Sequence, residues 1–394
     1  MIVTECLRTG GAQVFALRML KYLSKDHEVI LYYLHKELIN EKMVTQFEVG
    51  HSIRSGDHFL NLPFKLIDKV LRRLKSPYLL REELFRYSMY KLAKTGKVDL
   101  IHSNMFKADN IASQVAKKLS IPIVITMHGS YENFLKSTLG RKGEVIPGYL
   151  KKLTDHLRRV DGIAYLTQKN LEAPHYILSQ TKNFEMPPVR KIYNGFYSNF
   201  YEPKKRDELG ISDEDMVFGM VARAIPEKGW EYAIDAFNDL NDSSHLVLVG
   251  GGPLLNNLEK NNENDQIHFV GLSPNPLEWI SIFDVGLLPS LYDESLPNVI
   301  VEYLHLNVPV IATDIGETPE MIKTDFGDAG RIIDTSDTGR VREILTGFMK
   351  DFKNMDRDVL SNLKSLAGQA SKKFSMSECI SSYEKFYEYL LKNE

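Results

Sequence analysis

The sequence predicts an α/β protein of two domains, each built on a parallel sheet. Apolar runs rich in isoleucine and valine, such as those at 98–101 and 308–313, alternate with stretches of helical periodicity. Strands of this composition are typically buried on both faces, as they are in parallel sheets. The length of 394 residues is enough for two such cores. The charged segment 204–215 is typical of a linker between them.

The composition is that of a globular chain without a strong charge imbalance. Hydrophobic residues make up 43% and charged residues 26%, and the formal net charge of −3 excludes a strongly basic nucleic-acid binder. The two cysteines, Cys6 and Cys379, lie far apart without metal-ligand spacing, so we expect a reducing, cytoplasmic compartment. We also expect no secretory signal and no bilayer-spanning segment, which would need about 18 or more uncharged apolar residues.

Two features of the first domain lie at the ends of predicted strands. The start of the chain is typical of a short strand, a turn at Gly10 and Gly11, and an amphipathic helix; glycines there let the backbone approach a phosphate. A later strand, at 121–127, ends at His128, and parallel sheets bind ligands beyond the carboxyl ends of their strands. Simpler explanations remain open, namely a tight connection for the glycines and a structural hydrogen bond for the histidine.

The second domain begins with a strand at 216–222 that is followed by Arg223 and Lys228. An arginine can bind two phosphate oxygens at once, and a lysine adds a compact positive charge. The alternative is a pair of solvated basic residues near a turn. A glycine triplet at 250–252 does not complete a dinucleotide fingerprint, because Leu255 stands where the third spaced glycine should be. We therefore discount an NAD site.

The stretch from 284 to 320 predicts a strand, a helix from about Ser295, and a second strand. Ser295 suits a helix N-cap and Pro297 the first turn, and the N–H groups at a helix N-terminus favour an anion such as phosphate. Glu294 precedes the helix, while Glu302 lies among apolar residues within it, where it could accept paired hydroxyls of a sugar. The alternative is a capping charge and a solvated carboxylate.

These motifs together resemble those of the retaining glycosyltransferase family 4, also called glycosyl transferases group 1. The resemblance rests on two glutamates separated by seven residues, GGAQ at 10–13, TMHGS at 126–130 and VPVIATDIGETPE at 308–320. It implies the GT-B fold, in which two Rossmann-like domains face each other across a cleft. The expected parts are an acceptor-side domain at 1–200, a nucleotide-sugar-binding domain at 201–375, and a C-terminal helix at 376–394 that packs back on the first domain.

The resemblance also implies a role for each motif residue. Arg223 and Lys228 would hold the donor diphosphate in place of a metal ion, Glu294 would bind the transferred sugar, and His128 would orient it. The residues that contact the rest of the donor would be Gly10, Gly11, Gly271, Leu296, Pro297, Asn298 and Glu302. We expect neither a metal nor a cofactor.

The function implied is transfer of a sugar from a nucleotide-sugar to a saccharide or lipid-linked acceptor, in bacterial surface polysaccharide synthesis. Two alternatives stay open: a non-catalytic GT-B subunit of a polysaccharide assembly complex, and a GT-B nucleotide-sugar epimerase.

The segment 62–97 has a lopsided charge. It contains ten lysines and arginines against three acidic residues. A basic amphipathic segment can lie on an anionic membrane surface, and it can equally be a solvated helix face packed on its sheet. We therefore expect either peripheral membrane contact or an ordinary exposed helix.

Overall fold

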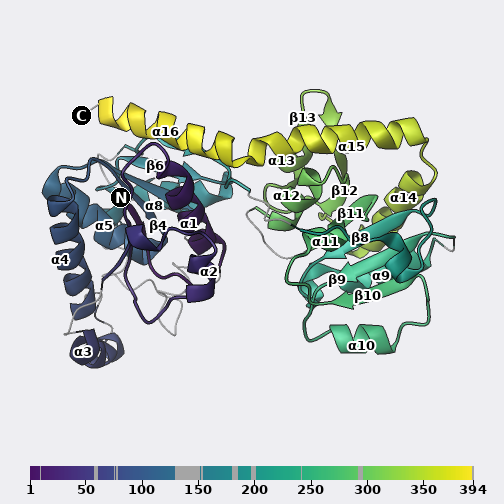
Figure 1. Ribbon diagram of the computed structural model, residues 1–394, viewed down its shortest axis with the longest axis horizontal. Helices are drawn as coiled ribbons and strands as arrows, with labels where there is room; N and C mark the ends of the chain where they lie inside the picture. The colour runs from purple at the N-terminus through teal and green to yellow at the C-terminus, as the bar shows by residue number, and fades with distance from the viewer. Residues whose placement is uncertain are drawn as a thin grey trace. The chain divides into compact units, whose positions relative to one another are not determined.

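The computed structural model divides into two compact units (Figure 1). Unit 1 comprises Met1–Gly195 together with Met376–Glu394, and unit 2 comprises Phe196–Ser375. The structure describes residues 1–8, 10–56, 61–74, 76, 79–128, 151, 154–179, 185–196, 201–240, 242–291 and 296–392.

Unit 1 is built on a seven-stranded parallel sheet with the order β3-β2-β1-β4-β5-β6-β7. Its strands are β1 (Ile2–Thr4), β2 (Leu31–Tyr33), β3 (Ile53–Ser55), β4 (Ile101–Asn104), β5 (Ile123–Met127), β6 (Gly162–Tyr165) and β7 (Val189–Lys191). The strand order reverses between β1 and β4, which is where ligands bind in open parallel sheets. The edge strand β7 was not predicted, because its sequence VRK is short and partly charged.

Helices cover both faces of this sheet. The helices of unit 1 are α1 (Gly11–Leu23), α2 (Glu41–Thr45), α3 (Asn61–Arg73), α4 (Leu80–Thr95), α5 (Phe106–Leu119), α8 (Lys169–Ser179) and α16 (Met376–Lys392). Buried side chains of α4 and α5 share one apolar cluster with the sheet. Those of α1 and α16 share a second cluster, so the last helix of the chain completes the core of the first unit.

A buried polar network attaches α16 to the sheet of unit 1. The ring of His102 on β4 lies 2.6 Å from the Tyr387 hydroxyl through Nδ1 and 2.7 Å from the Thr126 hydroxyl through Nε2. The Thr126 hydroxyl lies 2.8 Å from that of Tyr383. Burial lowers the pKa of His102 to about 3, with smaller contributions from His128 and the N-terminal amine. The histidine is therefore neutral at pH 7.

Unit 2 is built on a six-stranded parallel sheet with the order β10-β9-β8-β11-β12-β15. Its strands are β8 (Val217–Val221), β9 (His245–Val249), β10 (Ile267–Gly271), β11 (Val285–Leu288), β12 (Val310–Thr313) and β15 (Gly330–Ile333). A short hairpin of β13 (Lys323–Thr324) and β14 (Gly327–Asp328) was not predicted. The strand order reverses between β8 and β11. The prediction of two Rossmann-like domains is confirmed.

The helices of unit 2 pack in two groups. Helix α9 (Trp230–Asn238) lies against α14 (Val341–Lys353), and α12 (Asn298–His305) lies against α13 (Thr318–Ile322) and α15 (Arg357–Ser371). The shorter α10 (Leu255–Lys260) and α11 (Leu277–Ile280) follow β9 and β10. None of the helices within the described ranges is long and apolar enough to cross a lipid bilayer.

The segment 204–215 is a packed part of unit 2, so its assignment as a linker was wrong. The Arg206 guanidinium donates to Asp284 Oδ2 at 2.8 Å and to the Ile282 carbonyl at 3.0 Å. Asp284 also accepts from Lys364 Nζ at 2.8 Å and from the Val217 N–H at 3.0 Å. Burial acts to raise the pKa of Asp284, but these bonds and charges hold it below its usual value. Arg206 of this segment thus forms an ion pair with Asp284, the residue directly before β11.

Candidate functional site

The loops that follow β8 and β11 meet where the strand order of unit 2 reverses. Arg223 is exposed just after β8, and Lys228 ends the short turn η3 (Pro226–Lys228). Gly229 follows with a φ of 77°, in the left-handed region that glycine adopts most readily. A Cβ on Gly229 would also collide with the Pro289 carbonyl. The glycine therefore lets the Lys228 turn lie directly against the chain that leaves β11.

Hydrogen bonds fix that contact. The Glu227 carbonyl accepts from the Leu291 N–H at 2.8 Å and from the Ser290 hydroxyl at 3.2 Å. The Thr313 hydroxyl, at the end of β12, donates to the Ser290 carbonyl at 2.6 Å. The carboxyl ends of three neighbouring strands are thus connected. The chain leading toward α12 is held beside the Lys228 turn.

Helix α12 begins at Asn298, later than the predicted start at Ser295. Pro297 is the N-cap with a ψ of 111°, and this extended backbone prevents the helix from starting earlier. The N-cap residue, Pro297, makes no side-chain capping bond to the first N–H groups of α12. Leu296 is half-buried, Pro297 is buried and Asn298 is exposed. Glu294 and Ser295 lie outside the described residues.

Tyr303 fixes the position of α12 on the sheet. Its ring is fully buried and lies against Gly286, where any side chain would collide with it. Its hydroxyl accepts from the Val221 N–H at 2.9 Å and lies 3.3 Å from the Leu287 carbonyl, to which it donates. It therefore joins the last residues of β8 and β11. The neighbouring residue, Glu302, is half-buried on the same helix.

We expect Tyr303→Phe to destabilise unit 2 by about 1–3 kcal/mol, because a buried N–H loses its acceptor. Both tryptophans of the chain, Trp230 and Trp279, lie in unit 2, so urea unfolding followed by tryptophan fluorescence measures this unit. The half-buried Tyr232 provides the control, and Tyr232→Phe should change the midpoint little. Equal midpoints for the two variants would contradict the role given to the Tyr303 hydroxyl.

The glycine triplet at 250–252 supports the loop that carries Arg223. A Cβ on Gly250 would collide with the Ala222 carbonyl, and one on Gly252 with the Ala224 carbonyl. The Ala224 N–H donates to the Gly251 carbonyl at 3.0 Å. The triplet therefore allows two backbones to approach closely, a role that the fingerprint comparison missed. The sequence feature that could have predicted this close approach is the run of three glycines directly after a buried strand.

Gly271 ends β10 beside this triplet. Its carbonyl accepts from the Gly250 N–H at 2.8 Å, and its φ is 78°. A Cβ at this position would have no neighbour within 4 Å, so open space adjoins it. The structure thus places Gly271 on the same sheet edge as Arg223 and Lys228, two strands away from β8.

In unit 1, Gly10 and Gly11 begin α1 next to the strand reversal between β1 and β4. A Cβ on Gly11 would contact nothing within 4 Å, so space lies open beside it. In the first turn of α1, the Gln13 amide donates to the thioether sulfur of Met105 at 3.3 Å. Met105 has a φ of 83°, which is strained for a side chain other than glycine. This strained residue directly follows Asn104 at the end of β4.

His128 follows β5 and is paired with Asn104. Its Nε2 lies 3.0 Å from Asn104 Oδ1, and the ring of Phe15 meets its ring edge-on at 4.9 Å between centroids. Burial lowers the pKa of His128 to about 4, so it is neutral at pH 7. Asn104 is fully buried. Sequence reasoning did not identify Asn104, because a single asparagine after a strand carries no pattern.

Two polar atoms of this pair lack partners in the part of the chain that the structure describes: His128 Nδ1 and Asn104 Nδ2. With the amide oriented as described, Nδ2 is a donor and Nδ1 an acceptor. If the amide is flipped and the other tautomer is present, the donor and acceptor exchange places. Either way the pair presents one donor and one acceptor, which is the combination that a hydroxyl group satisfies.

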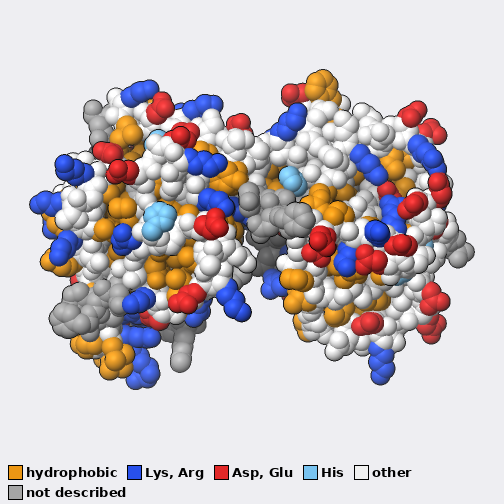
Figure 2. Space-filling model, viewed as in Figure 1, with side chains coloured by type: hydrophobic (Ala, Val, Ile, Leu, Met, Phe, Trp, Pro, Cys, Tyr) orange, Lys and Arg blue, Asp and Glu red, His pale blue; other side chains and the backbone are white. Residues whose placement is uncertain are grey.

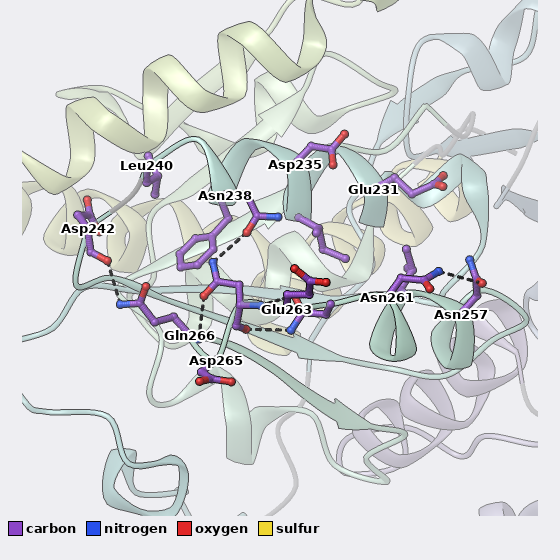
Figure 3. Close-up of a pocket in the computed structure, with 15 residues that line it drawn as sticks. Glu231, Asp235, Asn238, Leu240, Asp242, Asn257, Asn261, Glu263, Asp265 and Gln266 are labelled. Carbon is purple, nitrogen blue, oxygen red and sulfur yellow. Dashed lines mark hydrogen bonds between the residues drawn. The ribbon is translucent and has the colours of Figure 1, made fainter.

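The large hollow of unit 2 shown in Figure 3 lies elsewhere. It has a volume of about 870 Å³ and is lined by α9, α10 and the segments that lead into β9 and β10. Its lining contains the carboxylates Glu231, Asp235, Asp242, Glu263 and Asp265, and no lysine or arginine. Like charges would repel a diphosphate there. Over the described ranges, no group of three or more His, Cys, Asp or Glu side chains is placed to hold a metal ion.

The fold and this sheet edge define the class of protein. Two Rossmann-like units, with a basic pair and a helix N-terminus at the strand reversal of the second, are typical of GT-B nucleotide-binding enzymes. Two family models then match the chain, one in each half. Glycosyltransferase Family 4 matches residues 9–196, and Glycosyl transferases group 1 matches residues 202–362. The chain belongs to glycosyltransferase family 4, as its motifs predicted.

Individual relatives agree with this assignment. N-acetyl-alpha-D-glucosaminyl L-malate synthase of Bacillus anthracis is 24% identical over 88% of this chain and 91% of its own length. The teichuronic acid biosynthesis glycosyltransferase TuaC of Bacillus subtilis is 30% identical over 55% of this chain, and the match spans 54% of TuaC. Among solved structures, Anabaena HepE in complex with UDP has a TM-score of 0.71 at 16% identity, covering 98% of this chain and 99% of HepE.

Proposed function

We propose that this protein transfers a sugar from a nucleoside-diphosphate sugar to a saccharide or lipid-linked acceptor in bacterial surface polysaccharide or glycolipid synthesis, with retention at the anomeric carbon. The observation that carries the proposal is the Lys228 turn held beside the chain that leads to α12. The names of relatives support the substrate classes. TuaC is named for teichuronic acid biosynthesis, and HepE was crystallised with UDP.

In this proposal unit 2 holds the leaving group. Arg223 and Lys228 carry the charge opposite to that of a diphosphate, and the N-terminal N–H groups of α12 favour binding of an anion. They stabilise the negative charge that develops as the bond from the anomeric carbon to the diphosphate oxygen breaks. Glu302 accepts the ribose hydroxyls, and Glu294 binds hydroxyls of the transferred sugar. The acceptor oxygen bonds to the anomeric carbon from the same face, and its proton passes to the departing diphosphate.

A metal ion is not required in this proposal, because the basic pair takes its place. Activity should therefore persist when a chelator is present throughout the assay. Full loss in chelator with recovery on addition of magnesium would contradict this assignment.

Unit 1 contributes a hydroxyl-binding pair. His128 Nδ1 and Asn104 Nδ2 present one acceptor and one donor from a neutral pair, which suits a hydroxyl of the transferred sugar better than a phosphate. Asn104 is then a positioning residue for His128 and a contact in its own right.

We expect Asn104→Ala to lower kcat/KM for sugar transfer by about tenfold, the effect of one or two lost hydrogen bonds. Affinity for the free nucleoside diphosphate should not change, because unit 2 binds it. Asn110, a second buried asparagine of unit 1 whose Oδ1 faces Arg159, provides the control Asn110→Ala. Equal losses of transfer and of diphosphate affinity in Asn104→Ala would refute the role.

The donor nucleotide can be found by a thermal-shift and calorimetric screen against UDP, GDP, ADP and TDP and their common sugars. A ligand that binds only the folded state raises its melting temperature. One strong hit names the nucleotide, and product NMR then gives the anomeric configuration. Absence of any hit with folded protein would contradict the proposed function.

A further inference from the structure

Helix α3 carries an exposed apolar stripe in unit 1. Twelve large hydrophobic side chains are exposed in the described part of the chain, and five of them lie on or directly after α3. They are Leu62 (69% exposed), Leu66 (64%), Ile67 (45%), Val70 (53%) and Leu74 (72%). A concentration of this kind on one helix marks an interaction surface rather than scattered surface residues.

The helix has three distinct sectors around its axis. With about 100° per residue, the exposed apolar side chains occupy an arc of about 140°. The next arc contains Phe64, Asp68 and Leu71, which are buried or half-buried toward the body of unit 1. The third arc, on the other side of the apolar stripe, contains the exposed basic residues Lys65, Lys69 and Arg72, and the exposed Arg73 lies at the margin of the stripe next to that arc.

The single acidic residue of α3 is turned away from solvent. Asp68 is 4% exposed and accepts from the Leu80 and Arg81 N–H groups, at 2.7 and 3.2 Å, at the N-terminal end of α4. The charge that α3 offers outward is therefore entirely positive. Figure 2 shows this combination as orange and blue side chains side by side over α3.

We infer that α3 lies flat on a bilayer of anionic phospholipid, with its apolar stripe among the acyl chains and its basic arc on the headgroups. The charge decides between occupants. Lys65 lies 3.8 Å from Glu37, but Lys69, Arg72 and Arg73 add positive charge to this face, and a second copy of this chain would bring the same positive charges against them. An anionic headgroup layer complements them instead. The inference rests on the proposed function only in that such a surface would bring the enzyme to a lipid-linked acceptor.

The test is co-sedimentation of the full-length protein with vesicles of phosphatidylcholine, with and without about one third phosphatidylglycerol. We expect binding to the anionic vesicles at low salt that weakens as salt rises. Leu66→Gln with Val70→Gln should reduce the bound fraction at least about tenfold, since the inserted apolar area is lost. Lys69→Gln with Arg72→Gln and Arg73→Gln should abolish the preference for anionic vesicles. Leu272→Gln, at an 84% exposed leucine of unit 2, is the matched control and should bind normally.

Two results would overturn the inference: failure of the protein to bind anionic vesicles at low salt, or unchanged binding by the Leu66→Gln, Val70→Gln variant. A dimer in light scattering that this variant dissociates would assign the stripe to a second copy instead. The donor screen is independent of vesicles, so the proposed function can fail while α3 still binds lipid. Hydrogen exchange of the α16 amides, which belong to unit 1, should be the same in the α3 variants as in the native chain, and this shows that unit 1 of the variants is folded.

Discussion

Replacing Lys228 with alanine is expected to weaken use of the donor by about 2 kcal/mol or more, which is roughly 30-fold or more in kcat/KM. The lysine ends the turn whose Glu227 carbonyl accepts from the Leu291 N–H, on the chain leading to α12, and we propose that its charge acts on a diphosphate bound at the N-terminal end of that helix. A charge-assisted bond to a diphosphate is lost without compensation. The measurement is steady-state kinetics with the donor identified by the binding screen.

Matched variants separate charge from structure. Lys228→Arg keeps the positive charge and should retain part of the activity, although a planar guanidinium cannot occupy the same position as an ammonium. Lys260→Ala removes an exposed lysine from α10 of the same unit and should have no effect. Unchanged kinetics in Lys228→Ala, with Lys260→Ala also unchanged, would remove Lys228 from the site.

Replacing Glu302 with alanine should weaken donor use about as much as replacing Lys228 does, but for a different reason. Glu302→Ala removes the acceptor proposed for two ribose hydroxyls, and we again expect a loss of about 2 kcal/mol or more in donor use. Glu259→Ala, at an exposed carboxylate of α10, is the matched control. If Glu302 only supported the helix, the melting temperature would fall with no change in donor affinity.

The strands and helices that carry the chemistry were predictable because their periodicity is strong. Buried strands such as β5, β8 and β12 are mainly apolar runs, and motif residues follow β5 and β8 closely in sequence. The elements that were missed have weak local signals. The strand β7 has three residues, two of them charged, and it forms only because β6 offers an open edge for pairing.

The remaining differences come from tertiary contacts. The start of α12 is set by the extended backbone of Pro297, and residues 204–215 are packed because Arg206 meets Asp284, 78 residues away. Asn104 enters the candidate site only because β4 and β5 are neighbours, which brings its amide to His128. A single sequence contains no local pattern for such pairs.

Acidification is expected to destabilise unit 1 well above the range in which carboxylates titrate. Burial lowers the pKa of His102 to about 3, of His156 to about 3 and of His128 to about 4, from an ordinary value of 6.5. The unfolded chain therefore binds more protons than the folded chain below pH 6.5. Stability is fully present above that pH and is lost as the pH falls toward the folded values, by about 1.4 kcal/mol per pH unit for each histidine.

His102 allows this to be tested at one position. Its protonation would place a charge among Tyr383, Tyr387 and Thr126, which attach α16 to the sheet. His102→Gln should remove about 1.4 kcal/mol per pH unit from the slope of unfolding free energy between pH 6.5 and 4.5, and His51→Gln, at an exposed histidine, should not. Hydrogen exchange of α16 amides measures the slope within unit 1. A protonated His102 ring would need both neighbouring hydroxyls to act as acceptors, and they would have to reorient to do so. The ring also cannot leave the core. Equal slopes in the native chain and His102→Gln would therefore mean that α16 separates from the sheet before His102 titrates.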